Sequence, residues 1–196
     1  MFDAVEHGHA KWTDKLTLHD SDKVAGTGVF GEFSDGMQFP IRVLVDLMMV
    51  VSDNTATNLL LDRFTEALGL KDTRCLRKVL IGGKVGENQR FGLGVNPAAS
   101  REMIAILKRQ QDKNGMGRKT GDLPVADKTG SLDHLRSDVG IVYSPGGRLA
   151  IAITVDDLPD VNYSPDNTGS IFISQLTGLL LEGLAKHENQ RDAHPR

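Results

Sequence analysis

Residues 41–61 read IRVLVDLMMVVSDNTATNLLL, which is two apolar runs joined by a short polar turn. Only two charged residues interrupt the first run, from Ile41 to Val51, so it predicts a helix that is buried nearly all round. Ser52-Asp53-Asn54 ends this run, and Asp53 or Asn54 can cap a second helix from Thr55 to Phe64. The stretch therefore predicts two packed helices that meet at a polar triplet.

A second polar triplet, Lys128-Thr129-Gly130, opens a strand-like part of the chain. Residues 124–130 and 139–143 are followed by Pro145-Gly146-Gly147, which is typical of a turn, and by Leu149–Val155, which is rich in β-branched residues. These segments predict an antiparallel meander. Helical spacing predicts two further helices, from Pro97 to Arg109 and from Thr168 to Leu184.

Composition is that of an ordinary globular protein. The chain has 196 residues with 39% hydrophobic content, which favours one domain over residues 1–186, followed by a polar tail over 187–196 that we expect to be disordered. A formal charge of -3 without a basic block argues against nucleic acid or an anionic membrane as partner. The single cysteine, Cys75, excludes an internal disulfide, and no apolar stretch has membrane-spanning length.

Each triplet alone has an ordinary explanation. Ser, Asp and Asn are common helix caps, and a given tripeptide such as Lys-Thr-Gly occurs by chance. Their order and context agree, however, and the longer segments Ser52–Leu61, Lys128–Leu132 and Asp138–Val142 resemble those of class A β-lactamase-type domains, which are penicillin-recognising serine hydrolases. The resemblance extends from Met1 to about Leu184.

The resemblance implies an α+β fold of the β-lactamase/transpeptidase type. In that fold a helical lobe packs on a lobe with an antiparallel sheet flanked by helices, and the substrate, a small-molecule β-lactam or a cell-wall peptide, lies in the cleft between them. Here the N-terminal strands of the sheet would be missing. In the family those strands lie beside the segment Leu149–Val155, so we expect an exposed sheet edge through which the chain is unstable or self-associates.

Catalytic and binding roles follow from the resemblance, residue by residue. Ser52 resembles the hydroxyl that passes a proton to the β-lactam nitrogen, and Lys128 matches the cation beside it. The backbone N–H of Ser131 matches one of two oxyanion-hole donors. The remaining substrate-binding candidates are Asn54 for a side-chain amide, Thr129, Gly130 and Ser131 for the substrate carboxylate, and Arg136 as the nearest match to an active-site arginine.

The sequence departs from the family pattern at the nucleophile. No Ser or Thr in the chain is followed three places later by Lys, so the Ser-x-x-Lys signature is absent, and the resemblance would place it just before Met1. Glu87, the one carboxylate between Arg74 and Val95, is the candidate for positioning a deacylating water. Two hypotheses stay open: an acylating hydrolase of β-lactams, peptides or esters whose start lies upstream, or a non-catalytic remnant or binding module.

Other reactive side chains favour structural interpretations. Cys75 lies among basic residues, but a lone cysteine is usually a small apolar residue. His7-x-His9 and the acidic stretch Asp156–Asp160 lack a third spaced ligand and predict a solvated surface, so no metal or cofactor is expected. The first residues lack the pattern of a signal peptide, although relatives in the family are usually exported, so the compartment stays open.

Overall fold

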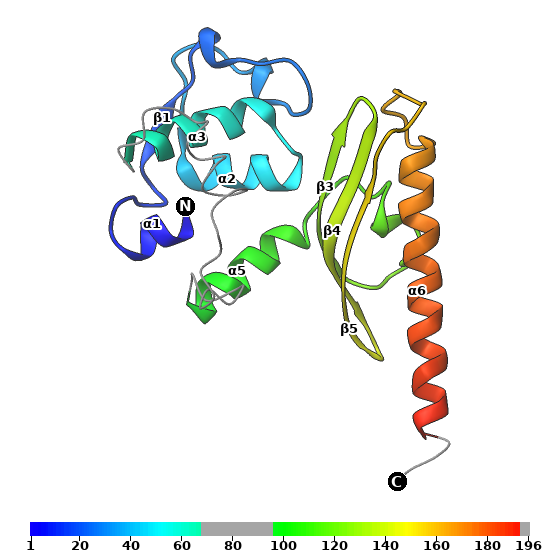
Figure 1. Cartoon of the computed structure of the whole chain (residues 1–196). Helices are drawn as coiled ribbons and strands as arrows, with labels where there is room; N and C mark the ends of the chain where they lie inside the picture. Colours follow the sequence, from blue (N-terminus) through cyan, green and yellow to red (C-terminus); the bar gives the residue numbers. More distant parts are fainter. Residues whose placement is uncertain (68–95, 193–196) are drawn as a thin grey trace. The chain divides into compact units, whose positions relative to one another are not determined.

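The computed structural model describes residues 1–67 and 96–192 (Figure 1). They form two compact units, Met1–Met103 and Ile104–Arg196, and each unit is described by itself. The first contains α1 (Phe2–Glu6), β1 (Lys15–Thr17), η1 (Asp20–Asp22), η2 (Phe30–Glu32), β2 (Gln38–Pro40), α2 (Ile41–Val50) and α3 (Asn54–Ala67). Helix α5 (Pro97–Leu107) spans the boundary, and the second unit contains η3 (Met116–Arg118), β3 (Val125–Leu132), β4 (Leu135–Ser144), β5 (Gly147–Val155) and α6 (Thr168–Asp192).

In the first unit, the two predicted helices are confirmed as α2 and α3, which pack against each other. Ile41, Leu44, Val45 and Val50 of α2 are buried, and Val43 is its one exposed residue, as the nearly continuous apolar run predicts. Because both helices bury apolar side chains, the turn between them is held at a fixed place on this unit.

The segment before α2 is more regular than the sequence predicts. Residues 11–40 suggest only loops and turns, yet β1 and β2 form an antiparallel ladder in which Leu16 faces Phe39. Strands of three residues are too short to show an alternating pattern. Phe30, Phe33 and Phe39 pack together near this ladder, with ring centroids 4.5–5.4 Å apart, and give the loop residues a small aromatic core.

In the second unit, the predicted meander is confirmed as a three-stranded antiparallel sheet in the order β3-β4-β5. Lys128 faces Val139 across the β3–β4 ladder, and Ser144 faces Gly147 at the tight β4–β5 turn. Helix α6 packs on β4 and β5, and it continues to Asp192, past the predicted end at Leu184 and into the stretch predicted as a polar tail.

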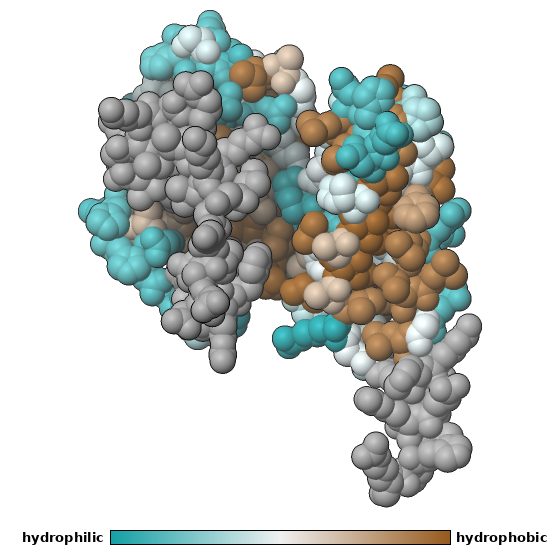
Figure 2. All heavy atoms as spheres, in the orientation of Figure 1, coloured by the Kyte–Doolittle hydropathy of each residue, from teal (hydrophilic) through white to brown (hydrophobic). Residues whose placement is uncertain are grey.

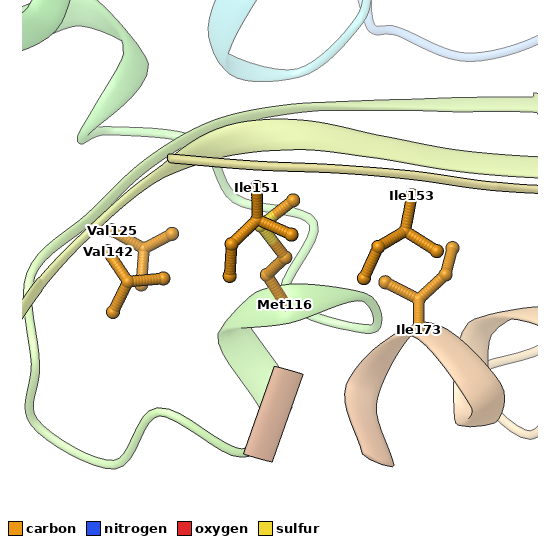
Figure 3. Packing of buried hydrophobic residues seen from close by; sticks show 6 residues of the cluster. All are labelled: Met116, Val125, Val142, Ile151, Ile153 and Ile173. Atoms are coloured by element: carbon orange, nitrogen blue, oxygen red, sulfur yellow. The ribbon is translucent and has the colours of Figure 1, made fainter. Parts of the chain in front are cut away.

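A hydrophobic core lies between this sheet and α6. Ile173 of α6 points toward the side chains of the sheet, and Met116 of η3 closes the same layer (Figure 3). The cluster consists of Met116, Val125, Val142, Ile151, Ile153 and Ile173. Because side chains alternate along a strand, Asp127 and Thr129 share the face of Val125, whereas Lys128 lies on the opposite face. Among the described helices, none is long and apolar enough to cross a membrane.

Candidate active site

The Ser52-Asp53-Asn54 turn has a fixed conformation in the first unit. Ser52 lies between α2 and α3 with φ 55°, a left-handed conformation that few residues other than glycine adopt. Asp53 follows with 1% of its surface exposed. A strained backbone persists only where the surrounding structure holds it, so hydrogen bonds must fix this turn.

Asp53 supplies those hydrogen bonds. Its Oδ1 accepts from the backbone N–H of Ala56 at 2.8 Å, which caps α3 and confirms the predicted cap. Its Oδ2 accepts from the N–H groups of Val29 at 2.7 Å and Phe30 at 2.8 Å. One buried carboxylate thus joins the helix start to the loop that precedes η2.

The loop over residues 24–30 also holds Asn54. The Asn54 N–H donates to the carbonyl of Thr27 at 3.0 Å, and its side-chain amide donates to the carbonyl of Ala25 at 3.2 Å. Gly28 has φ 123°, and a Cβ atom there would lie 2.1 Å from Oδ2 of Asp53, so only glycine allows this approach. The loop over residues 24–30 therefore fixes the side chains of Asp53 and Asn54.

The Lys128-Thr129-Gly130 triplet lies on β3 of the second unit. Lys128 is half-buried, and its ammonium donates to the carbonyl of Thr129 at 2.7 Å. Burial lowers the pKa of Lys128, while the carboxylates of Asp112, Asp138 and Asp127 oppose this shift. Gly130 and Ser131 are exposed on the same strand, so the strand presents a cation and polar backbone groups to solvent.

Two fully buried carboxyl groups lie beside this triplet. Asp127 precedes Lys128 on β3, and Asp138 of β4 faces Thr129 across the ladder. Oδ2 of Asp138 accepts from the Met116 N–H at 2.8 Å, but its Oδ1 and both oxygens of Asp127 lack a hydrogen-bond partner among the described residues. The Lys113 ammonium lies 3.9 Å from Oδ1 of Asp127.

Burial changes the protonation of these acids. It raises the pKa of Asp138 to about 7, although the hydrogen bond from Met116 opposes the shift, and the nearby carboxylate of Asp127 adds to it. Burial likewise raises the pKa of Asp127. The strand that carries Lys128 is therefore backed by two carboxyl groups that hold their protons more tightly than exposed aspartates do.

Asp138→Asn tests this effect through the pH dependence of stability. Because the folded-state pKa of Asp138 is raised from 3.8 to about 7, the folded state retains a proton that the unfolded state loses, and the free energy of unfolding falls between about pH 4 and 7. The variant should lack this contribution, which is on the order of 4 kcal/mol over the window. Urea unfolding at several pH values measures it, with the exposed Asp122→Asn as control; a wild-type-minus-variant difference that does not change with pH contradicts the prediction.

Arg136 is buried and binds backbone carbonyl groups. Its side chain is 3% exposed, and its guanidinium donates to the carbonyls of Leu132, Leu135 and Asn162 and lies 4.8 Å from the ring of Tyr163. These contacts brace the β3–β4 turn against the segment that follows β5. Binding of a substrate carboxylate by Arg136 stays a prediction.

The predicted site residues are divided between the two units of the structure. Ser52 and Asn54 belong to the first unit, whereas Lys128, Thr129, Gly130 and Ser131 belong to the second. Glu87 and Cys75 lie outside the described residues. Within the described ranges, no three His, Cys, Asp or Glu side chains are placed to hold a metal ion.

The sequence motifs identified Ser52 and Lys128 but not the buried carboxyl groups beside them. They gave no role to Asp127 or Asp138, and they indicated Asp53 only as a helix cap. The signal was present, because Asp127 adjoins Lys128 and the segment beginning at Asp138 was part of the resemblance. What the sequence lacked was the β3–β4 register that places Asp138 opposite Thr129.

Comparison with known proteins gives a family and a fold. The profile of the beta-lactamase enzyme family matches residues 1–184. A search of curated proteins gave no match. Among solved structures, a beta-lactamase from Sphaerobacter thermophilus DSM 20745 is 27% identical with a TM-score of 0.72, and the match covers 94% of this chain and 78% of that one.

Three further structures support the same fold. PBP-A is 21% identical with a TM-score of 0.72, and the match covers 94% of this chain and 76% of that one. An ancestral class A beta-lactamase is 20% identical with a TM-score of 0.72, covering 93% of this chain and 80% of that one. A mutant of PBP-A, 22% identical with a TM-score of 0.72, was solved as an acyl-enzyme complex with penicillin G; the match covers 94% of this chain and 76% of that one. These matches confirm the predicted α+β, β-lactamase/transpeptidase-like fold.

Proposed function

The chain belongs to the beta-lactamase enzyme family, and we propose that it forms the substrate-binding and proton-transfer part of a serine hydrolase that acts on β-lactams through an acyl-enzyme. The observation that carries this proposal is the Ser52-Asp53-Asn54 turn. Ser52 keeps a left-handed backbone beside Asp53, whose buried carboxylate accepts three backbone hydrogen bonds. Such a preorganised turn is what a proton-transfer hydroxyl needs.

The proposed reaction uses the two motifs together. A serine hydroxyl adds to the β-lactam carbonyl, the C–N bond of the ring breaks, and the ring nitrogen takes a proton through the hydroxyl of Ser52. The positive charge of Lys128 favours the substrate carboxylate, which Thr129 and Ser131 would also bind. Asn54 would hold the substrate's side-chain amide, and the Ser131 N–H would donate to the developing oxyanion.

The Ser-x-x-Lys signature of the family does not occur in these 196 residues. No Ser or Thr has a Lys three positions later, so the proposal assigns the attacking serine and its lysine to residues encoded upstream of Met1. Glu87 remains the proposed group for activating the deacylating water. A mutant of PBP-A forms an acyl-enzyme with penicillin G, and on that basis we propose a β-lactam as the substrate class here. A cell-wall peptide is the alternative substrate that the family resemblance implies.

Labelling with a fluorescent penicillin tests the proposal. The 196-residue chain should show no covalent label after denaturing electrophoresis, whereas a chain extended through the in-frame upstream codons should be labelled at a Ser-x-x-Lys serine. Replacing that serine with alanine provides the control. A stop codon directly upstream, or an extended chain that stays unlabelled, contradicts the proposed function.

The missing nucleophile favours a second candidate, a non-catalytic binding module of the same fold. This module would retain Asn54, Lys128 and Thr129 for weak binding but form no covalent bond. Reversible binding of penicillin to the 196-residue chain, measured by titration and lost in Lys128→Ala, would support it. Covalent labelling of the same chain would exclude it.

A further inference from the structure

The turn between β3 and β4 is tied to the segment that follows β5. It consists of Asp133 and His134, and Leu132 and Leu135 pair across the ladder on either side of it. The His134 carbonyl accepts from the N–H of Leu158 at 2.9 Å, and Nδ1 of His134 lies 2.6 Å from the carbonyl of Leu158. Figure 2 shows largely hydrophilic surface at this end of the unit, where Figure 1 places the start of α6, so polar contacts rather than apolar packing hold the turn.

Tyr163 and Arg136 add to this connection. The Tyr163 hydroxyl donates to Oδ1 of Asp133 at 2.7 Å, and the guanidinium of Arg136 lies 4.8 Å from the centroid of the Tyr163 ring. Nη1 of Arg136 donates to the carbonyl groups of the two residues that flank the turn, and Nη2 donates to the carbonyl of Asn162. One guanidinium thus joins the ends of β3 and β4 to the segment after β5.

Arg136 is enclosed where it makes these contacts. The residue is 3% exposed, and a Cβ atom added at Gly169, in the first turn of α6, would lie 3.0 Å from its Cγ. The side-chain amide of Asn167, the residue before α6, donates at 3.0 Å to the same Asn162 carbonyl that Arg136 binds. Because backbone carbonyls accept its hydrogen bonds and its stem packs against α6, the guanidinium is held in one place.

The strand register shows which way the N–H of Ser131 points. In an antiparallel ladder, alternate residues of each strand bond to the partner strand, and the Tyr143 N–H donates to the Pro124 carbonyl at 3.0 Å. Counting in steps of two from Pro124 reaches Leu132, so these residues bond to β4, whereas Ser131 directs its N–H away from β4. Ser131 also directly precedes the pair that closes the turn. The direction of its N–H therefore depends on how the turn is held.

We infer that Arg136 is a positioning residue: it binds the carbonyls on both sides of the turn and so holds the end of β3 with the Ser131 N–H directed at the oxyanion that forms during acylation. This inference rests on the proposed function, which assigns that N–H to the oxyanion hole. A donor stabilises the transition state only when it is fixed where the negative charge develops. Tyr163 keeps Arg136 in place by covering its guanidinium and binding Asp133. Binding of the substrate carboxylate by Arg136, the expectation from the resemblance, predicts different kinetics.

Amide exchange in the 196-residue chain tests the position of the turn without the nucleophile. Arg136→Lys keeps the positive charge but cannot bind all three carbonyls. Exchange of the Leu132 and Leu135 amides, followed by NMR, should become about tenfold faster or more, because the ends of the ladder are released. The Val139 amide, in the middle of the same ladder, should change little. Arg148→Lys, an exposed arginine on β5, is the matched control.

Acylation kinetics in the upstream-extended chain separate positioning from substrate binding. Arg136→Lys should lower the rate at saturating penicillin about tenfold or more and leave the half-saturating concentration within about twofold, because the oxyanion forms only during the reaction. Tyr163→Phe, which loses the hydroxyl bonded to Asp133, should lower the same rate about two- to threefold. Tyr143→Phe removes the hydroxyl of the other tyrosine in the chain and should leave the rate unchanged.

Two results would overturn the inference. One is unchanged exchange of the Leu132 and Leu135 amides in Arg136→Lys. The other is a half-saturating penicillin concentration that rises in Arg136→Lys while the saturating rate stays at the wild-type value, which is the effect expected of a ligand to the substrate carboxylate. An extended wild-type chain that penicillin does not label contradicts the proposed function instead, and amide exchange then decides alone whether Arg136 holds the end of β3.

Discussion

Asp53→Ala is expected to lower the free energy of unfolding by about 3–5 kcal/mol, because it leaves the N–H groups of Val29, Phe30 and Ala56 without their acceptor. Two of these hydrogen bonds tie the loop over residues 24–30 to the start of α3. Loss of the Asp53 carboxylate should therefore also weaken the hold of this loop on Asn54, which donates hydrogen bonds to Ala25 and Thr27. Urea unfolding followed by circular dichroism measures the change.

Asp62→Ala is the matched control for this prediction. Asp62 lies on α3, the helix that Asp53 caps, but unlike Asp53 it is exposed. Surface substitutions of this kind change stability by about 0.5 kcal/mol or less. Equal unfolding midpoints for Asp53→Ala and Asp62→Ala would show that Asp53 does not support the turn.

Ser52→Ala is expected to reduce the rate of acylation by a factor of about 10²–10⁴ in the upstream-extended chain that the proposed function requires. The reason is that the β-lactam nitrogen would lose its proton donor while the nucleophile and the binding groups stay in place. Stopped-flow labelling with a fluorescent penicillin measures the rate at saturating substrate. We expect no comparable change in its binding constant.

Ser34→Ala provides the comparison for this effect. Ser34 is an exposed serine in the same unit with no proposed role, so its replacement should leave acylation unchanged. Thermal unfolding of both variants should show that neither loses its fold. Acylation of Ser52→Ala at the wild-type rate would remove Ser52 from the proposed proton transfer.

The regular elements could be predicted where the sequence pattern is long. The apolar runs on both sides of Ser52-Asp53-Asn54 predicted α2 and α3, and the β-branched segments predicted the meander. The β1–β2 ladder could not be predicted, because strands of three residues show no alternation. The extension of α6 to Asp192 crosses a polar stretch in which composition favoured a tail.

Only the motif residues of the candidate site could be predicted, not the buried residues beside them. Ser52 and Lys128 were found because short motifs carry them, whereas the buried position of Asp138 depends on strand register, which no motif records. The same register places Gly140 opposite Asp127, where a Cβ atom would lie 2.7 Å from that of the aspartate. Arg136 shows the converse, since a motif-based match cannot reveal that its guanidinium binds backbone carbonyls.

One distance tests the central claim most directly, namely that Ser52-Asp53-Asn54 and Lys128-Thr129-Gly130 serve a single substrate. It is the separation between Oγ of Ser52 and Nζ of Lys128 in a crystal structure of the chain soaked with a penicillin. We predict that the two atoms lie within hydrogen-bonding reach, about 3 Å, or are bridged by one bound group. Side chains that point to opposite sides of the molecule, with no shared ligand, would contradict it.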